Sequence, residues 1–184
     1  GAHSTLAYAG SLLDLDTVAD AMREPRLAGF VERLMREDIA PTLAMPAGFD
    51  AAGYIDAVLA RFRNPAVRHR LSQIAWDGSQ KLPVRLVGTI VDALDAGRPV
   101  GRLCFPLAAW MHFVRRQVFR AAELIDPLAA KLVRIAGAAT GVARDDVEAF
   151  LAVDPGFLPL LRDERVLVEL CGAYARLGID PSAI

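Results

Sequence analysis

The chain has 184 residues, of which 54% are hydrophobic, and a formal net charge of −1 at pH 7. This length allows one large domain or two small ones, and the apolar content is sufficient for a core without disulfides or a structural metal. The near-neutral charge argues against general attraction to nucleic acid or to an anionic membrane, and no stretch approaches the roughly 18 uninterrupted apolar residues of a transmembrane helix.

The two cysteines and the first residues bear on where the protein works. Cys104 and Cys171 each lie in an apolar run, and no basic segment followed by an apolar signal core is present at the start. We therefore expect a cytoplasmic protein with reduced thiols. Because the chain starts at Gly1 and not at Met, we also expect that it was processed or cut, or prepared as part of a longer protein.

The first third of the chain has a helical pattern. Apolar residues recur three and four positions apart, and no alternating strand pattern of useful length appears. Asp16 and Asp50 suit the capping position that precedes a helix. Pro25 suits a first helical turn, and Pro41 ends the helix that Pro25 begins. The helices expected here cover residues 16–22, 25–39 and 50–62.

A fourth helix is expected to start at Asn64-Pro65 and to run to about residue 80, because asparagine caps helices and proline favours their first position. Along this helix a polar stripe recurs every four positions: His69, Gln73, Asp77 and Lys81. Lys81 is one of only two lysines among 21 basic residues. A lysine ammonium is a compact donor on a flexible side chain, whereas an arginine guanidinium is a planar, forked donor. A lysine in a chain that otherwise uses arginine therefore favours a role for Lys81 that needs an ammonium group.

The ordinary interpretation of this stripe is a solvated helix face, with side-chain pairs worth a few tenths of a kcal/mol. Two neighbouring residues argue against it. Trp76 stands among the polar residues and is expected to require burial. Gly78 costs about 1 kcal/mol relative to alanine inside a helix, so it predicts the close approach of another backbone or of a ligand.

The rest of the chain continues the helical pattern. Pro83 indicates a kink or a restart, and Gly178 is expected to be the left-handed cap of the last helix. Neither an internal repeat nor a low-complexity linker occurs, so the sequence predicts one all-α domain of about eight to ten helices. The remaining helices are expected from residue 83 to about 94, over 103–120, over 126–137, from 145, and over 164–177.

The other chemically capable residues give weaker signals. His3, followed by Ser4, precedes an apolar helix and would ordinarily be a capping or exposed residue. His112 lies beside Trp110 and is expected to be satisfied in the core or in a groove. No histidine or cysteine pair has zinc-site spacing, so no metal is predicted. A Gly-x-Gly-x-x-Gly turn, a phosphate loop and a serine nucleophile elbow are all absent from the sequence.

Two readings without catalysis are open from the residues alone. A local basic run could bind nucleic acid, although a solvated helix end or phosphate contacts to a cofactor fit the neutral total charge better. This run consists of Arg61, Arg63, Arg68, His69 and Arg70. The chain could also be a free-standing helical interaction module, with a groove lined by Trp76, Trp110 and His112.

Three blocks of sequence carry a family resemblance. They are Gly-Ala-His-Ser-Thr-Leu-Ala-Tyr at 1–8, Arg-Phe-Arg-Asn-Pro-Ala-Val-Arg-His-Arg at 61–70, and Gln-Ile-Ala-Trp-Asp-Gly-Ser-Gln-Lys-Leu-Pro at 73–83. In this order they resemble the C-terminal domain of the mannitol dehydrogenase family, the long-chain polyol dehydrogenases that include fructuronate reductase. The resemblance covers nearly the whole chain. It implies a multi-helical domain over residues 1–184, similar to the C-terminal domain of 6-phosphogluconate dehydrogenase-like enzymes.

The resemblance implies that this chain is the substrate half of an oxidoreductase, and that an N-terminal Rossmann-like domain which binds most of the NAD lies outside it. The implied reaction is metal-independent hydride transfer between a polyol or aldonate and its ketone. The family's catalytic signature places a lysine base and an asparagine before a histidine followed by serine. His3-Ser4 matches the end of this signature, and the other two residues would precede Gly1.

The resemblance also names two substrate-binding positions. Lys81 matches a substrate-binding lysine of the family. Members specific for mannitol tend to carry an arginine eight positions earlier, where this chain has Gln73. This difference favours the fructuronate reductase branch or a broader polyol enzyme. The implied partners are a small polyol, ketose or sugar acid and the N-terminal domain, without nucleic acid or membrane, and the isolated chain is expected to be inactive.

Overall fold

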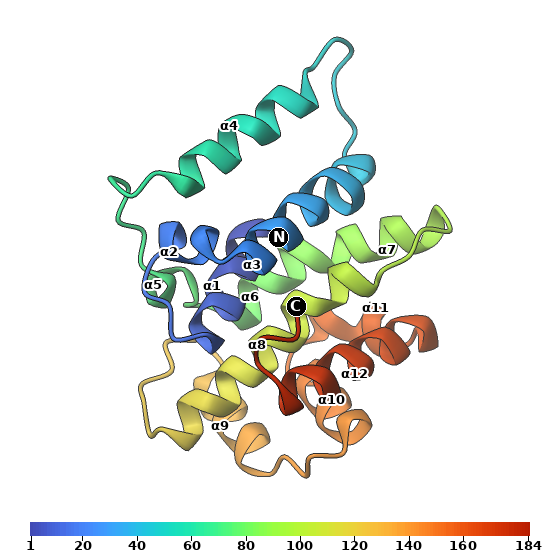
Figure 1. The fold of residues 1–184 in the computed structure, drawn as a ribbon. Helices are drawn as coiled ribbons and strands as arrows, with labels where there is room; N and C mark the ends of the chain where they lie inside the picture. The colour runs from blue at the N-terminus through green and yellow to red at the C-terminus, as the bar shows by residue number, and fades with distance from the viewer.

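The structure, a computed structural model, describes residues 1–184 and contains helices but no strand (Figure 1). The all-α prediction is thereby confirmed. The α-helices are α1 (Ala2–Leu12), α2 (Val18–Arg23), α3 (Pro25–Arg33), α4 (Ala51–Arg63), α5 (Leu71–Ile74), α6 (Gly78–Leu82), α7 (Gly88–Asp95), α8 (Gly101–Phe119), α9 (Ala129–Gly137), α10 (Ala143–Leu151), α11 (Leu158–Leu161) and α12 (Glu164–Ile179). Two π-helical segments, η1 (Leu34–Ile39) and η3 (Pro83–Val87), and two 3-10 turns, η2 (Ala40–Thr42) and η4 (Pro155–Phe157), extend or connect them.

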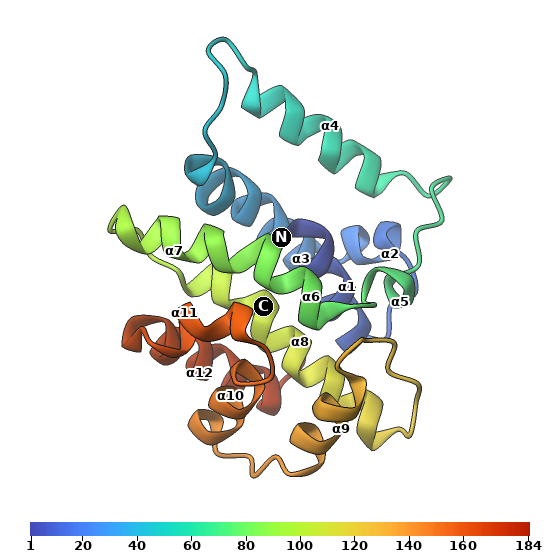
Figure 2. The same ribbon diagram turned by 180° about the vertical axis from the view of Figure 1, so that it is seen from behind.

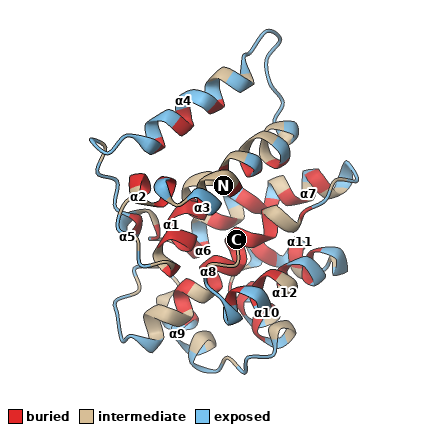
Figure 3. Ribbon diagram, viewed as in Figure 1, coloured by how far each residue is buried: buried red, intermediate tan, exposed pale blue.

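Helix α8 forms the centre of the molecule. It is apolar on most of its surface, and residues from Leu103 to Met111 are all buried. Helices α1 and α12 pack along it, and in both ribbon views α1 lies on one side of α8 and α12 on the other (Figures 1 and 2). Figure 3 shows burial concentrated on α8 and α1, while much of α4 is exposed. The buried residues form one continuous cluster, as expected for a single domain.

Most of the expected helix starts are confirmed to within a few residues. Asp50 accepts a hydrogen bond from the backbone N–H of Gly53 and so caps α4, and Pro25 is the first residue of α3. The cap of α2 is Thr17 and not Asp16, because Thr17 and Asp20 form a reciprocal capping box. The helix expected over 25–39 keeps its extent, but its last part widens into the π-segment η1.

The helix expected from Pro65 to residue 80 is wrong. Residues 64–70 form a turn and a short extended segment, because the backbone N–H of Val18 donates to the carbonyl of His69 and that of Leu71 donates to the carbonyl of Asp16. The helix then breaks again at Asp77, whose φ of 57° is left-handed. The polar stripe is therefore divided among three elements and does not form one helix face.

Three further expectations about single residues need correction. Trp76 is 41% exposed, because the break before α6 places it in a turn at the surface. Gly178 lies inside α12 and has no left-handed backbone, and its Cα faces the His112 ring. Trp110 is buried and stacks on Phe157, with ring centroids 5.5 Å apart. Trp76, Trp110 and His112 therefore line no common groove.

The expectation for Gly78 is confirmed in part. A Cβ at this position would lie 2.5 Å from Nε1 of Trp110 and 2.6 Å from Oη of Tyr8. Both neighbours are buried, so a Cβ here would force one of these core side chains to shift. The closely approaching groups are side chains of the core, and not another backbone or a ligand.

Candidate functional site

His3 lies in the first turn of α1, half-buried between two other elements. Its ring centroid is 4.4 Å from that of Phe62 in α4 and 6.4 Å from that of His69 in the extended segment. Burial lowers the pKa of His3 to about 4, helped by the neighbouring His69, Arg61 and Arg85. The imidazole is therefore neutral at pH 7, with one nitrogen that donates a hydrogen bond and one that accepts.

A pocket of about 380 Å³ opens beside His3. Its walls come from α1, η1, α4 and η3, and most of the lining is apolar, for example Met35, Ile39 and Val58. The charged groups that line it are Arg61 and Arg85, and no acidic side chain does. Its size is within the usual range for a small-molecule site.

Lys81 lies in α6, directly before η3. Its ammonium donates a hydrogen bond to the carbonyl of Trp76 at 2.7 Å, and its Nζ lies 3.7 Å from a carboxylate oxygen of Asp77. The side chain keeps 29% of its surface accessible. Figure 2 shows α6 beside the start of α1, and a Cβ added to Gly1 would lie 3.3 Å from Leu86 of η3, the segment that continues α6.

The turn that carries Lys81 is fixed by the loop before α9. The buried Ser79 donates from its hydroxyl to Oδ1 of Asp126 at 2.5 Å and from its backbone N–H to Oδ2 at 2.9 Å. The backbone N–H of Asp77 donates to the carbonyl of Ile125 at 3.0 Å. We call Gly78, Ser79 and Asp126 the turn cluster. From the sequence, Asp126 was expected only to start a helix, because no local pattern links it to Ser79.

The three residues predicted for the site are only partly brought together. His3 lines the pocket, whereas Gln73 on α5 and Lys81 on α6 do not. Gln73 is exposed and makes no side-chain hydrogen bond. Lys81 stands four residues before Arg85 along the continuous helix of α6 and η3, so it is about one turn from a residue of the pocket wall. The structure adds three neighbours of His3 that the predicted site did not include: Arg61, His69 and Arg85.

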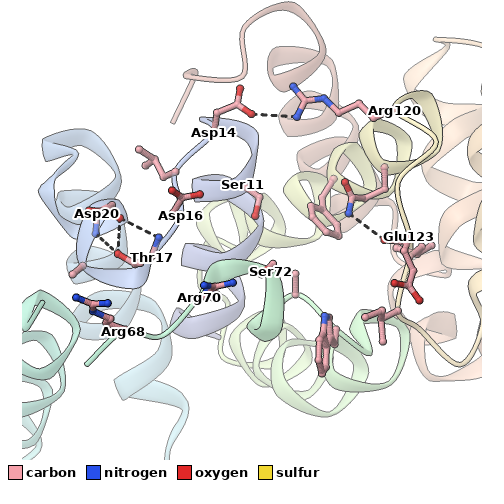
Figure 4. Close-up of a pocket in the computed structure, with 18 of the residues that line it drawn as sticks. Ser11, Asp14, Asp16, Thr17, Asp20, Arg68, Arg70, Ser72, Arg120 and Glu123 are labelled. Atoms are coloured by element: carbon pink, nitrogen blue, oxygen red, sulfur yellow. Dashed lines mark hydrogen bonds and ion pairs between the residues drawn. The ribbon is translucent and has the colours of Figure 1, made fainter. Parts of the chain in front are cut away.

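A larger hollow of about 970 Å³ lies elsewhere, between α2 and the end of α8 (Figure 4). Trp76, Arg68 and Arg70 line it, but none of the predicted site residues does. Half of its charged residues are paired within the protein, since Asp14 binds Arg120 and Asp20 binds Arg23. The basic run of residues 61–70 is thus divided between two hollows and does not form one continuous patch.

Two further searches of the structure concern membranes and metals. No helix combines the length and the apolar character needed to cross a lipid bilayer. No three His, Cys, Asp or Glu side chains come together in an arrangement that could hold a metal ion.

Comparison with known proteins identifies close similarity to one family. The model of the mannitol dehydrogenase C-terminal domain matches residues 1–177. The D-mannonate oxidoreductase of Escherichia coli is 37% identical over 155 residues, which cover 83% of this chain and 32% of that protein. A mannitol 2-dehydrogenase of Aspergillus fumigatus is 32% identical over 183 residues, which cover 98% of this chain and 36% of that protein.

Comparison of the fold with solved structures identifies the same family. Mannitol 2-dehydrogenase of Pseudomonas fluorescens, solved as a ternary complex with NAD and D-mannitol, superimposes with a TM-score of 0.87 at 25% identity over 98% of this chain and 37% of that one. The chain thus spans about a third of the length of the relatives that it matches. From the family model and the fold together, the chain belongs to the mannitol dehydrogenase C-terminal domain family.

Proposed function

We propose that this chain is the substrate-binding half of an NAD-dependent oxidoreductase that interconverts a secondary alcohol of a polyol or aldonate and its ketone. The observation that carries the proposal is that His3, in the family-matched segment, stands at a pocket of small-molecule size. The relatives that match over most of this chain are named as oxidoreductases of these substrates.

In this proposal His3 binds the reacting oxygen of the substrate. A neutral imidazole can donate to an alcohol or ketone oxygen without placing a second full charge beside the developing alkoxide. The ring contacts Phe62, and both side chains line the pocket.

Lys81 and Gln73 are proposed to bind hydroxyl groups further along the substrate. An ammonium has three N–H donors, and Lys81 directs two of them toward Trp76 and Asp77. The third can reach a substrate hydroxyl. The Gln73 amide has both a donor and an acceptor and no partner within the chain. It can therefore either donate a hydrogen bond to a substrate hydroxyl or accept one from it.

The cofactor is proposed to bind on a separate N-terminal Rossmann-like domain of the full-length protein. The chain has no strand and no Gly-x-Gly-x-x-Gly turn, so it contains no element that fits the dinucleotide. When bound, NAD supplies the hydride acceptor. The helical domain, residues 1–184, would supply the substrate pocket and His3. The full-length enzyme would be cytoplasmic and would need no metal.

The test is a substrate panel on the full-length enzyme. We expect NADH formation with a polyol or an aldonate, a fall of about 100-fold or more in kcat for His3→Ala, and a smaller fall for His3→Gln, which keeps a donor. The variants should retain the wild-type melting temperature to within a few degrees. Absence of turnover with every polyol and aldonate, or unchanged kcat in His3→Ala, would refute the proposal.

A further inference from the structure

The pocket beside His3 carries positive charge that no ion pair within this chain neutralises. Arg61 reaches it from α4 and Arg85 from η3, and neither forms an ion pair. By contrast Arg63, two residues along α4 from Arg61, does not line the pocket and pairs with Glu32 at 3.6 Å. Two guanidinium groups thus face one pocket that has no acidic side chain.

Lys81 is a weaker candidate for binding an anion. Its ammonium already lies near the Asp77 carboxylate and donates to the carbonyl of Trp76. An incoming carboxylate at Lys81 would therefore be repelled by Asp77. At Arg61 and Arg85 no such carboxylate stands in the pocket wall.

We propose that Arg61 and Arg85 bind the carboxylate of the substrate, so that this protein acts on a sugar acid in preference to a neutral polyol. This inference rests on the proposed function, and it narrows the substrate class. The planar fork of a guanidinium matches a carboxylate with two parallel hydrogen bonds. Both arginines are exposed, so their guanidinium groups are accessible to an incoming carboxylate.

The experiment uses the full-length enzyme with two matched six-carbon substrates, D-mannonate and D-mannitol, which differ in the carboxylate at one end. The variants are Arg61→Gln, Arg85→Gln and the control Arg63→Gln. We expect wild type to have the higher kcat/KM for D-mannonate, and a KM for this substrate that rises with salt. Arg61→Gln and Arg85→Gln should each lower the ratio of kcat/KM for D-mannonate to that for D-mannitol by about tenfold or more, and Arg63→Gln by less than about threefold.

The possible outcomes separate the two proposals. Turnover of D-mannitol with no turnover of D-mannonate would overturn the carboxylate site and leave the oxidoreductase function standing. An unchanged ratio in both Arg61→Gln and Arg85→Gln would also overturn the site. If neither these substrates nor any other polyol or aldonate of the panel is turned over, the proposed function fails, and calorimetric titration with D-mannonate then decides the carboxylate site. Equal binding of D-mannonate by wild type and by the double variant Arg61→Gln/Arg85→Gln would overturn the carboxylate site. Loss of binding in this double variant would support the site.

Discussion

Two carboxylates, the partly buried Asp126 and the buried Asp146, hold different parts of the molecule with the same kind of hydrogen bonds. Asp126 accepts from the hydroxyl and the backbone N–H of Ser79, and so fixes the turn that carries Lys81. Asp146 accepts from the backbone N–H groups of Thr140 and Gly141 and from the hydroxyl of Tyr174. It therefore joins the start of α10 to α12.

We call Asp146, Tyr174, Arg115 and His112 the C-terminal cluster. Arg115 donates to the Tyr174 hydroxyl at 2.5 Å, and His112 stacks on the Tyr174 ring. This cluster lines neither the His3 pocket nor the Lys81 turn. The same kind of carboxylate cluster thus lies beside the Lys81 turn at Asp126 and away from the candidate site at Asp146.

The largest expected effect is on the C-terminal cluster. Asp146→Ala should lower the free energy of unfolding by about 3 kcal/mol, because it removes the acceptor of two backbone N–H groups and of the buried Tyr174 hydroxyl. Tyr174→Phe, which keeps the ring, should cost about 1 kcal/mol. Urea denaturation measures both. In the full-length enzyme, KM should stay at the wild-type value for Tyr174→Phe, and a raised KM would show that this cluster also affects the site.

Gly78→Ala tests the packing under the Lys81 turn. The added Cβ would clash with Trp110 and Tyr8, so we expect a loss of about 2 kcal/mol in the free energy of unfolding. Gly88→Ala is the matched control, since Gly88 begins α7 and a Cβ there would meet no atom within 4 Å. The control should gain up to about 1 kcal/mol. Similar effects of the two substitutions would contradict this account of Gly78.

Asp126→Asn tests whether the turn cluster positions Lys81. The amide keeps one acceptor oxygen but turns the other into a donor opposite a donor of Ser79, so stability should fall by about 1–2 kcal/mol. In the full-length enzyme KM should rise several-fold at a temperature where the variant is folded, because Lys81 is displaced. An unchanged KM together with a reduced stability would assign Asp126 to folding alone.

The smallest expected effect is the pH dependence of the C-terminal cluster. Burial alone would raise the pKa of Asp146, but hydrogen bonds from Thr140, Tyr174 and Gly141 outweigh it, so the pKa is lowered in the folded state. The stabilisation is therefore complete above the unfolded pKa of about 3.9, and it is lost as the pH falls through the folded value. Asp146→Asn should flatten the loss of stability below about pH 4, and a parallel decline in both proteins would contradict this role.

The sequence by itself determined the elements whose causes are local. The spacing of apolar residues predicted the long helix α8, and Asp50 and Pro25 predicted the starts of α4 and α3. These features depend on contacts within one or two helical turns, which a single sequence shows directly. The three blocks at the start, 61–70 and 73–83 also identified the family, which the comparisons confirm.

Only the tertiary structure decided the shape of the candidate site. The chain around His69 is extended because it pairs with the segment before α2, about 50 residues earlier, and that pairing outweighs the local preference of Asn64-Pro65 for a helix start. In the same way Arg61 and Arg85 meet His3 at one pocket only because α1, α4 and η3 pack together. Hydrogen bonds and charges between distant segments leave no periodic pattern in the sequence, so they emerge only from the folded chain.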